Sequence, residues 1–92
     1  MNKVDMKVYL VQITKDREKV VVIWFSSYEG PLVRVFDSIG QVTNLYKGLF
    51  GKPIPDYLNV TRELFWKEIE KLQELDKSLQ DYDFRDIRKS LI

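Results

Sequence analysis

The chain has 92 residues, of which 45% are hydrophobic and 32% are charged, so we expect one folded domain over residues 1–92 rather than a disordered segment. Its formal net charge of +1 argues against a strongly cationic nucleic-acid binder and against an acidic mimic of DNA. Cysteine and histidine are absent, which excludes disulfides and removes the commonest general acid or base and the commonest metal ligand. We therefore expect a non-enzymatic protein with no catalytic residues, no cofactor and no metal site.

Two further absences bear on where the protein acts. No apolar run approaches the ~20 residues that a membrane span needs, and the first residues lack the pattern of a secretory signal. We therefore expect a cytoplasmic protein that does not bind a membrane. Alanine is also absent, although it is normally among the commonest residues. A skewed coding composition of this kind favours the hypothesis of a phage or mobile-element accessory or inhibitor protein.

The first part of the chain is rich in β-branched and aromatic residues and predicts a three-stranded antiparallel meander. Met6–Thr14 and Lys19–Phe25 form a predicted hairpin around the polar loop Lys15–Glu18. A third strand, Leu32–Phe36, follows a Gly–Pro turn. Pairing of Thr14 with Lys19 would place Ile13 opposite Val20, and one face would carry Tyr9, Val11, Ile13, Val20, Val22 and Trp24.

The predicted middle strand is apolar on both faces, because Val20 to Phe25 is a continuous apolar run. An antiparallel sheet with one wet face would instead alternate apolar and polar residues. Either the two larger helices that follow divide between the two faces, or both cover one face and a partner covers the other. We favour the second alternative, and we expect the partner to be a second copy in a homodimer.

The remainder of the chain predicts two amphipathic helices and a short C-terminal helix, so the expected fold class is α+β. The first helix follows Ser38, whose spacing to Gln41 fits a capping box, and it ends at Gly51. The last helix lies within residues 84–92, with Asp83 as its predicted cap.

The longest helix is predicted within residues 54–81, and it begins either with Pro55 as its first residue or with Asn59 as its N-cap. Glu68 and Asp76 fall inside its apolar stripe, about 12 Å apart along the axis, which is too far for a catalytic pair. A buried carboxylate needs a cationic or hydrogen-bonding partner, for which Arg34 is the candidate. The apolar stripe itself comprises Leu58, Leu64, Phe65, Ile69, Leu72, Leu75 and Leu79.

Aromatic residues outside the expected core favour protein–protein contacts, since such residues are common anchors of interfaces. Trp66 lies beyond the edge of the apolar stripe, and Tyr28 and Tyr82 fall in a turn and at a helix end. With Trp24 they form the predicted partner-binding set. The alternative for Trp66 is packing under a loop or on a neighbouring helix. We expect an interaction protein that binds an unidentified protein partner and itself.

Nucleic-acid binding is the alternative function. Basic side chains beside aromatic residues on a sheet can bind single strands through phosphate contacts and stacking. Asp16 and Glu18 interleave with these cations and weaken their field. The predicted nucleic-acid contacts are Lys15, Arg17, Lys19 and Lys7, with Tyr9 and Trp24 as the aromatic residues.

Overall fold

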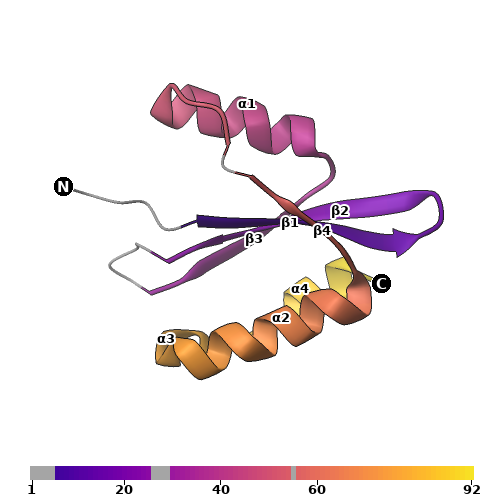
Figure 1. Ribbon diagram of the computed structural model, residues 1–92, viewed down its shortest axis with the longest axis vertical. Helices are drawn as coiled ribbons and strands as arrows, with labels where there is room; N and C mark the ends of the chain where they lie inside the picture. The colour runs from indigo at the N-terminus through magenta and orange to yellow at the C-terminus, as the bar shows by residue number, and fades with distance from the viewer. Residues whose placement is uncertain (1–5, 26–29, 55) are drawn as a thin grey trace.

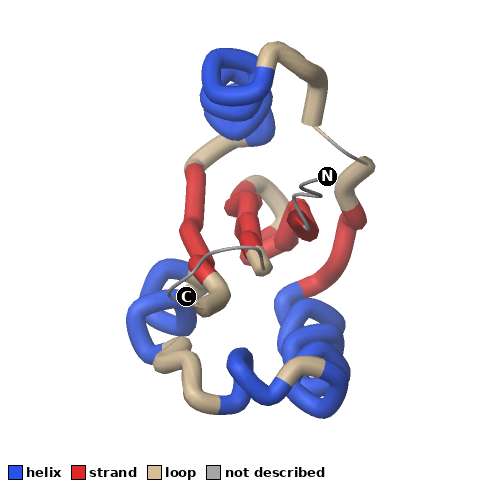
Figure 2. Tube along the Cα trace, turned by 90° about the vertical axis from the view of Figure 1, so that its left-hand side faces the viewer, coloured by secondary structure: helices blue, strands red, loops and turns tan. Residues whose placement is uncertain are grey.

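In the computed structural model, which describes residues 6–25, 30–54 and 56–92, a mixed four-stranded sheet lies between two layers of helix (Figures 1 and 2). The strand order is β3-β2-β1-β4, and β4 runs parallel to β1 while the other pairs are antiparallel. The α+β class is as predicted, but the expected three-stranded meander is extended by a fourth strand. The elements are β1 (Met6–Thr14), β2 (Arg17–Trp24), β3 (Leu32–Phe36), α1 (Ile39–Phe50), β4 (Leu58–Thr61), α2 (Arg62–Leu75), α3 (Lys77–Gln80) and α4 (Arg85–Ser90).

The β1–β2 hairpin is tighter than predicted. Its turn contains only Lys15 and Asp16, and Leu10 rather than Ile13 lies opposite Val20. The register therefore differs from the prediction by an odd number of residues, which moves the side chains of β2 to the other face relative to β1. An irregularity near the end of β1 accommodates the shorter turn. The hairpin residues that share the face toward α2 are Tyr9, Val11, Ile13, Val21 and Ile23.

Strand β4 occupies residues that the sequence predicted as the start of the longest helix. It pairs with the second half of β1, with Leu58 opposite Tyr9 and Val60 opposite Val11. The helix begins only after it, where the Thr61 hydroxyl accepts a hydrogen bond from the backbone N–H of Leu64 at 3.2 Å. Asn59, one of the two predicted starts, therefore lies in β4, and Pro55, the other, lies outside the described residues. The spacing of the apolar residues is compatible with either structure, and a long-range pairing partner decided between them.

The same predicted helix also ends early, at Leu75. Asp76 has extended backbone dihedrals, and its carboxylate accepts hydrogen bonds from the backbone N–H and the hydroxyl of Ser78, at 3.0 and 2.6 Å. The side chain thus caps the short helix α3 and interrupts the longer one. The prediction that Arg34 is the partner of Glu68 and Asp76 is wrong. Arg34 lies opposite Val22 in the β2–β3 ladder, so its side chain projects on the α1 face of the sheet, away from α2.

Both faces of the sheet are covered by helices of the same chain. Val21 and Ile23 face α2, α3 and α4, whereas Val20 and Val22 face α1, and all four are fully buried. Figures 1 and 2 show α1 on one side of the strands and the other three helices on the opposite side. The two larger helices therefore divide between the faces. The reason given for a homodimer, an uncovered sheet face, does not apply to this molecule.

The α2 side holds the larger core. The rings of Tyr9 and Phe65 meet edge to face with their centroids 5.5 Å apart, and Leu79 of α3 and Ile87 of α4 complete the packing. The Arg62 guanidinium donates to the carbonyl oxygen of Leu91 at 2.9 Å, which ties the start of α2 to the end of α4. Burial of each large apolar side chain of this kind contributes about 1.5–3 kcal/mol relative to exposure.

Candidate protein-binding surfaces

Trp66, the first of the predicted partner-binding residues, is engaged by its own chain. Its ring meets Phe65 and Phe84 edge to face, with centroid distances of 4.9 and 6.0 Å. The Arg88 guanidinium carbon lies 4.1 Å from the Trp66 ring centroid, in the geometry of a cation–π contact. Trp66 therefore packs α4 against α2, which was the alternative predicted for it.

Of the other predicted anchors, Tyr82 belongs to the same aromatic cluster as Trp66, because both pack on Phe84, whereas Trp24 lies on the other face of the sheet. Tyr82 packs on Phe84, and its hydroxyl donates to the carbonyl oxygen of Val33 at 3.3 Å. Trp24 is half-buried beneath the α1 layer. Tyr28 lies outside the described residues. The structure therefore does not bring Trp66, Tyr82 and Trp24 together into one contact surface.

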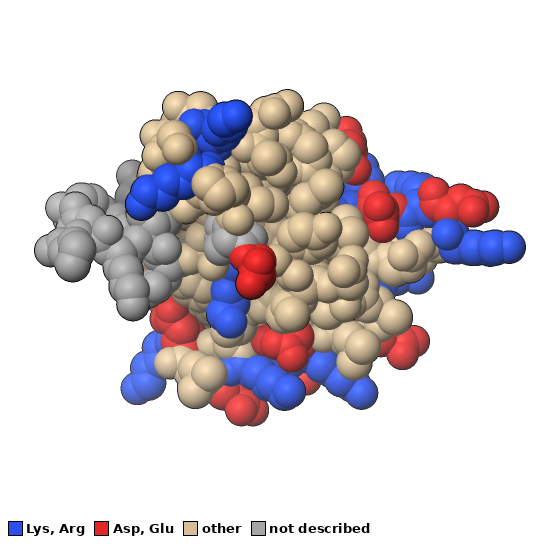
Figure 3. Space-filling view, turned by 45° about the horizontal axis from the view of Figure 1, so that its top comes forward, with Lys and Arg blue, Asp and Glu red and all other residues tan. Residues whose placement is uncertain are grey.

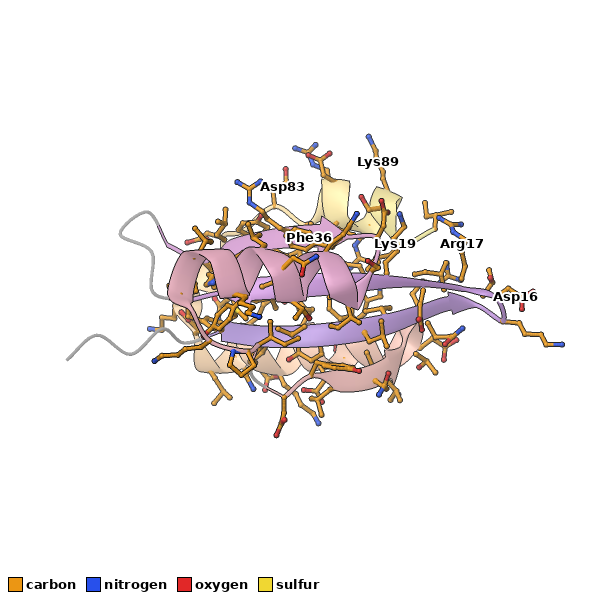
Figure 4. All side chains as sticks on the ribbon, turned by 90° about the horizontal axis from the view of Figure 1, so that it is seen from above. Asp16, Arg17, Lys19, Phe36, Asp83 and Lys89 are labelled. Atoms are coloured by element: carbon orange, nitrogen blue, oxygen red, sulfur yellow. The ribbon has the colours of Figure 1, made fainter. Side chains whose placement is uncertain are left out.

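The predicted nucleic-acid contacts are also dispersed. Lys7 and Lys15 are eight residues apart on and beyond β1, about 26 Å at the rise of a strand. Lys19 forms an ion pair with Asp37 at 2.5 Å, and Figure 4 shows Arg17 beside Asp16 at the hairpin end. The Lys19 hydrogen bond holds the pKa of the Asp37 carboxyl below its usual value. Tyr9 is buried and unable to stack on a base.

Carboxylates do not gather into a metal site within the described parts of the chain. Asp83 instead accepts hydrogen bonds from the Arg85 guanidinium at 2.7–3.0 Å and from the Arg85 backbone N–H. These bonds to the side chain and backbone of Arg85 lower the pKa of Asp83 to about 2. In the same described residues, no helix combines the length and the apolar character that crossing a bilayer requires.

The second half of α1 exposes apolar side chains to solvent. Val42 is 2% exposed, but Leu49 is 64% exposed, although it lies only about 20° from Val42 around the helix axis. Leu49 is two turns further along, about 10 Å, and does not pack against the core that Val42 joins on this side of the sheet. Leu45 and Phe50 are also exposed. We call Leu45, Leu49 and Phe50 the α1 surface.

The α1 surface is nearly free of charge. Lys47 is the single charged residue of α1, and residues 39–54 contain no aspartate or glutamate. Figure 3 shows an area without charged side chains on this side of the molecule, bordered by basic side chains at its upper left and by charged groups of both signs along its lower border and at the hairpin end. An exposed helix normally carries charged or polar residues on its outer side. On α1 that outer side carries Gln41, Asn44 and Lys47, whereas the residues of the α1 surface lie within about 80° of the buried Val42 around the axis.

A second set of exposed leucines lies on α2. Leu64 is 51% exposed and Leu75 is 85% exposed. On the helix axis both point about 160–180° away from Trp66, which faces α4. They therefore lie on the side of α2 away from α4. We call Leu64 and Leu75 the α2 surface; between them around and along the helix lies the ion pair of Glu68 and Lys71, with 3.8 Å between its charged atoms.

The free edge of β3 borders a shallow hollow of about 310 Å³, lined in part by Val35, Asp86 and Ile87. Its backbone is partly occupied, because Tyr82 donates to the Val33 carbonyl and the Asp37 N–H donates to the Gln41 side chain at 2.9 Å. An edge capped in this way is poorly suited to accept another strand.

The exposed leucines were part of the predicted apolar stripes, and sequence reasoning assigned them to the core. The apolar residues of α1 fall within about 140° of arc, and that pattern by itself predicts one buried face. The feature of the sequence that could have indicated an unusual surface on α1 is its low charge. A helix whose outer side is solvated seldom has a single charged residue in twelve.

The chain was also compared with known proteins. No protein-family model, no characterised protein and no solved structure matched it. The proposals below therefore rest on the surface chemistry of the chain itself.

Proposed function

We propose that the protein is a small non-catalytic interaction protein that acts through protein–protein contacts made by the α1 surface. The observation that supports this proposal is the exposure of Leu45, Leu49 and Phe50 on adjacent turns of a helix with one charge. Single exposed apolar residues are normal, but a contiguous apolar area marks an interaction site more often than chance. Burial of this area against a partner would recover the hydrophobic free energy that the monomer leaves unused.

The first partner to test is a second copy of the chain. Light scattering over a dilution series should give a molar mass that rises above 11.0 kDa with concentration. The double variant Leu45→Gln, Leu49→Gln should stay at a lower mass than the wild type, because glutamine keeps helix propensity but removes the apolar area. Ile92→Gln is the matched control, since Ile92 is 74% exposed but lies outside the α1 surface.

A photo-crosslinking amino acid detects contacts with other proteins. Placed at position 49 in the producing cells, it should join the chain to a defined partner, whereas at position 92 it should not. Circular dichroism and the thermal midpoint show whether each variant remains folded. If the wild-type chain stays monomeric and position 49 crosslinks to no protein more than position 92 does, the proposal is wrong.

A further inference from the structure

The exposed leucines of α2 belong to a regular row of four side chains. At spacings of four, three and four residues, the row contains Leu64, Glu68, Lys71 and Leu75, which fall within about 60° of arc around the helix. Leu64 and Leu75 are 51% and 85% exposed, and the ion pair of Glu68 and Lys71 lies between them. We call these four residues the α2 row. Alternating spacings of three and four residues are typical of the seam along which two helices pack.

The α2 row lies below the free edge of β4. Helix α2 packs on β1 and β4, whereas α4 packs on β3 at the other edge of the sheet. Figure 1 shows β4 in front of the other strands and α2 in front of α4. The row points away from α4, so it faces outward on the β4 side. Leu58 of β4 is 53% exposed and lies opposite Tyr9, whose ring faces α2, so apolar side chains continue from the helix onto the strand.

The outer edge of β4 carries backbone groups without a strand partner. In the order β3-β2-β1-β4, this strand pairs with β1 alone. Beyond that ladder, no turn or loop hydrogen bond within the described parts of the chain involves the backbone of residues 58–60. The edge of β3 is instead partly capped by Tyr82 and Gln41. An open edge can accept an extended strand that supplies the missing hydrogen bonds.

A second copy of the chain supplies a strand and a helix in matching positions. Antiparallel pairing of β4 with β4 of the second copy, about a two-fold axis perpendicular to the sheet, makes the two sheets continuous. Both α2 helices then lie on the same face and run antiparallel. Because α2 packs on β1 and β4 alike, the two helices are separated by about two strand spacings, or about 10 Å, which is the distance between packed helices.

The residues of the α2 row read the same in both directions, as leucine, charge, charge, leucine. In an antiparallel pair centred on the row, Leu64 faces Leu75 of the second copy, and Glu68 faces Lys71 of the second copy. Each leucine meets a leucine and each carboxylate meets an ammonium group, so the row is complementary to itself. A parallel pair in register would place Glu68 beside Glu68, and like charges across an interface are costly. The charges therefore select the antiparallel pair.

We propose that two copies of this chain form a symmetric dimer through the edge of β4 and the α2 row. This contact involves no residue of α1, so it goes beyond the proposed function and does not depend on it. Both α1 surfaces remain free in the dimer, because α1 packs on the opposite face of the sheet from α2.

Leucine variants test the dimer in a full chain that lacks the α1 surface. With Leu45→Gln and Leu49→Gln in place, light scattering should still give a species of twice 11.0 kDa at high concentration. Adding Leu64→Gln and Leu75→Gln should reduce the mass to 11.0 kDa, whereas adding Ile92→Gln instead should leave the dimer intact. Circular dichroism shows whether each variant remains folded.

Two results of this experiment would overturn the dimer. If the chain with an intact α2 row stays at 11.0 kDa at every concentration, two copies do not bind through it, and crosslinking at position 49 still decides the proposed function separately. If the Leu64→Gln, Leu75→Gln chain remains folded and dimeric, the contact lies elsewhere.

Amide hydrogen exchange tests the strand half of the contact. Exchange within residues 58–60 should be slower in the dimer than in the monomeric leucine variant, because strand pairing protects the outer N–H groups. Equal exchange in the two samples would exclude pairing of β4 with β4.

Charge reversals in the same background test the antiparallel register. Glu68→Lys and Lys71→Glu should each weaken the dimer by about tenfold or more, because each places like charges opposite one another at two positions. An equal mixture of the two variants should dimerise like the parent chain, and so should the double exchange Glu68→Lys, Lys71→Glu. The matched control is Glu70→Lys, since Glu70 is exposed on the same helix about 120° from Leu64 and should not affect the dimer. If the mixture dimerises no better than either variant alone, Glu68 and Lys71 do not face each other and the arrangement is wrong.

Discussion

The Arg88 guanidinium carbon lies 4.1 Å from the centroid of the Trp66 ring, and the edge of the same indole meets Phe84. Trp66 thus joins α2 to α4. Trp66→Ala should lower the free energy of unfolding by about 2–4 kcal/mol, because a large ring is removed from between two helices. Urea denaturation followed by circular dichroism measures this loss. Unchanged stability together with lost self-association would instead make Trp66 an interface anchor.

The Tyr9 hydroxyl is buried without a hydrogen-bond partner among the described residues. A buried hydroxyl without a partner costs about 1–3 kcal/mol of desolvation. Tyr9→Phe keeps the edge-to-face contact with Phe65 and removes this cost, so it should raise the free energy of unfolding by about 1 kcal/mol. Chemical denaturation measures the change. A destabilised Phe variant would show that the hydroxyl does have a partner in solution, such as a bound water.

Alkaline pH should destabilise the protein through the same residue. Desolvation by burial, with a smaller effect of the Glu68 carboxylate, raises the pKa of Tyr9 from 10.0 to about 12. Below pH 10 the phenol is neutral in both states and its contribution to stability is complete. Between pH 10 and 12 the unfolded chain loses its proton first, so stability falls by up to about 2–3 kcal/mol. The difference in unfolding free energy between wild type and Tyr9→Phe should grow over this interval, and a constant difference would contradict the assignment.

Two glycines at the end of α1 should respond to alanine in opposite directions. Gly48 lies inside the helix, and an added Cβ would meet no atom within 4 Å beyond its chain neighbours and the helix's own backbone. Gly48→Ala should therefore stabilise the protein by about 0.8–1 kcal/mol. Gly51 ends the helix with φ at 67°, a conformation that disfavours a side chain, so Gly51→Ala should destabilise it by about 1 kcal/mol. Thermal unfolding of both variants compares them, and a shift in the same direction would contradict the helix end described here.

Local chemistry determined several elements of this protein. Ser38 and Gly51 bound α1 as their residue types predict, because caps and left-handed positions are properties of short segments. The Ser38 hydroxyl accepts from the Gln41 N–H, while the Gln41 side chain accepts from the N–H of Asp37 rather than from that of Ser38. Asp83 accepts the N–H of Arg85, the first residue of α4, but the N-cap position belongs to Phe84, so the predicted cap is one residue too early. The positions of β1, β2 and β3 followed from their β-branched and aromatic residues.

Only the tertiary structure decided which segment forms β4, which helix covers each face of the sheet and which apolar residues are exposed. Each of these features depends on contacts between residues distant in the chain. Leu58 belongs to a strand rather than a helix because Tyr9 lies opposite it, and no local spacing encodes that pairing. Val20 and Val22 needed no partner chain because α1 crosses to their face. Leu49 and Leu75 belong to apolar stripes by pattern, yet they are 64% and 85% exposed. A pattern shows which side of a helix is apolar, and only the packed neighbours determine how much of that side is buried.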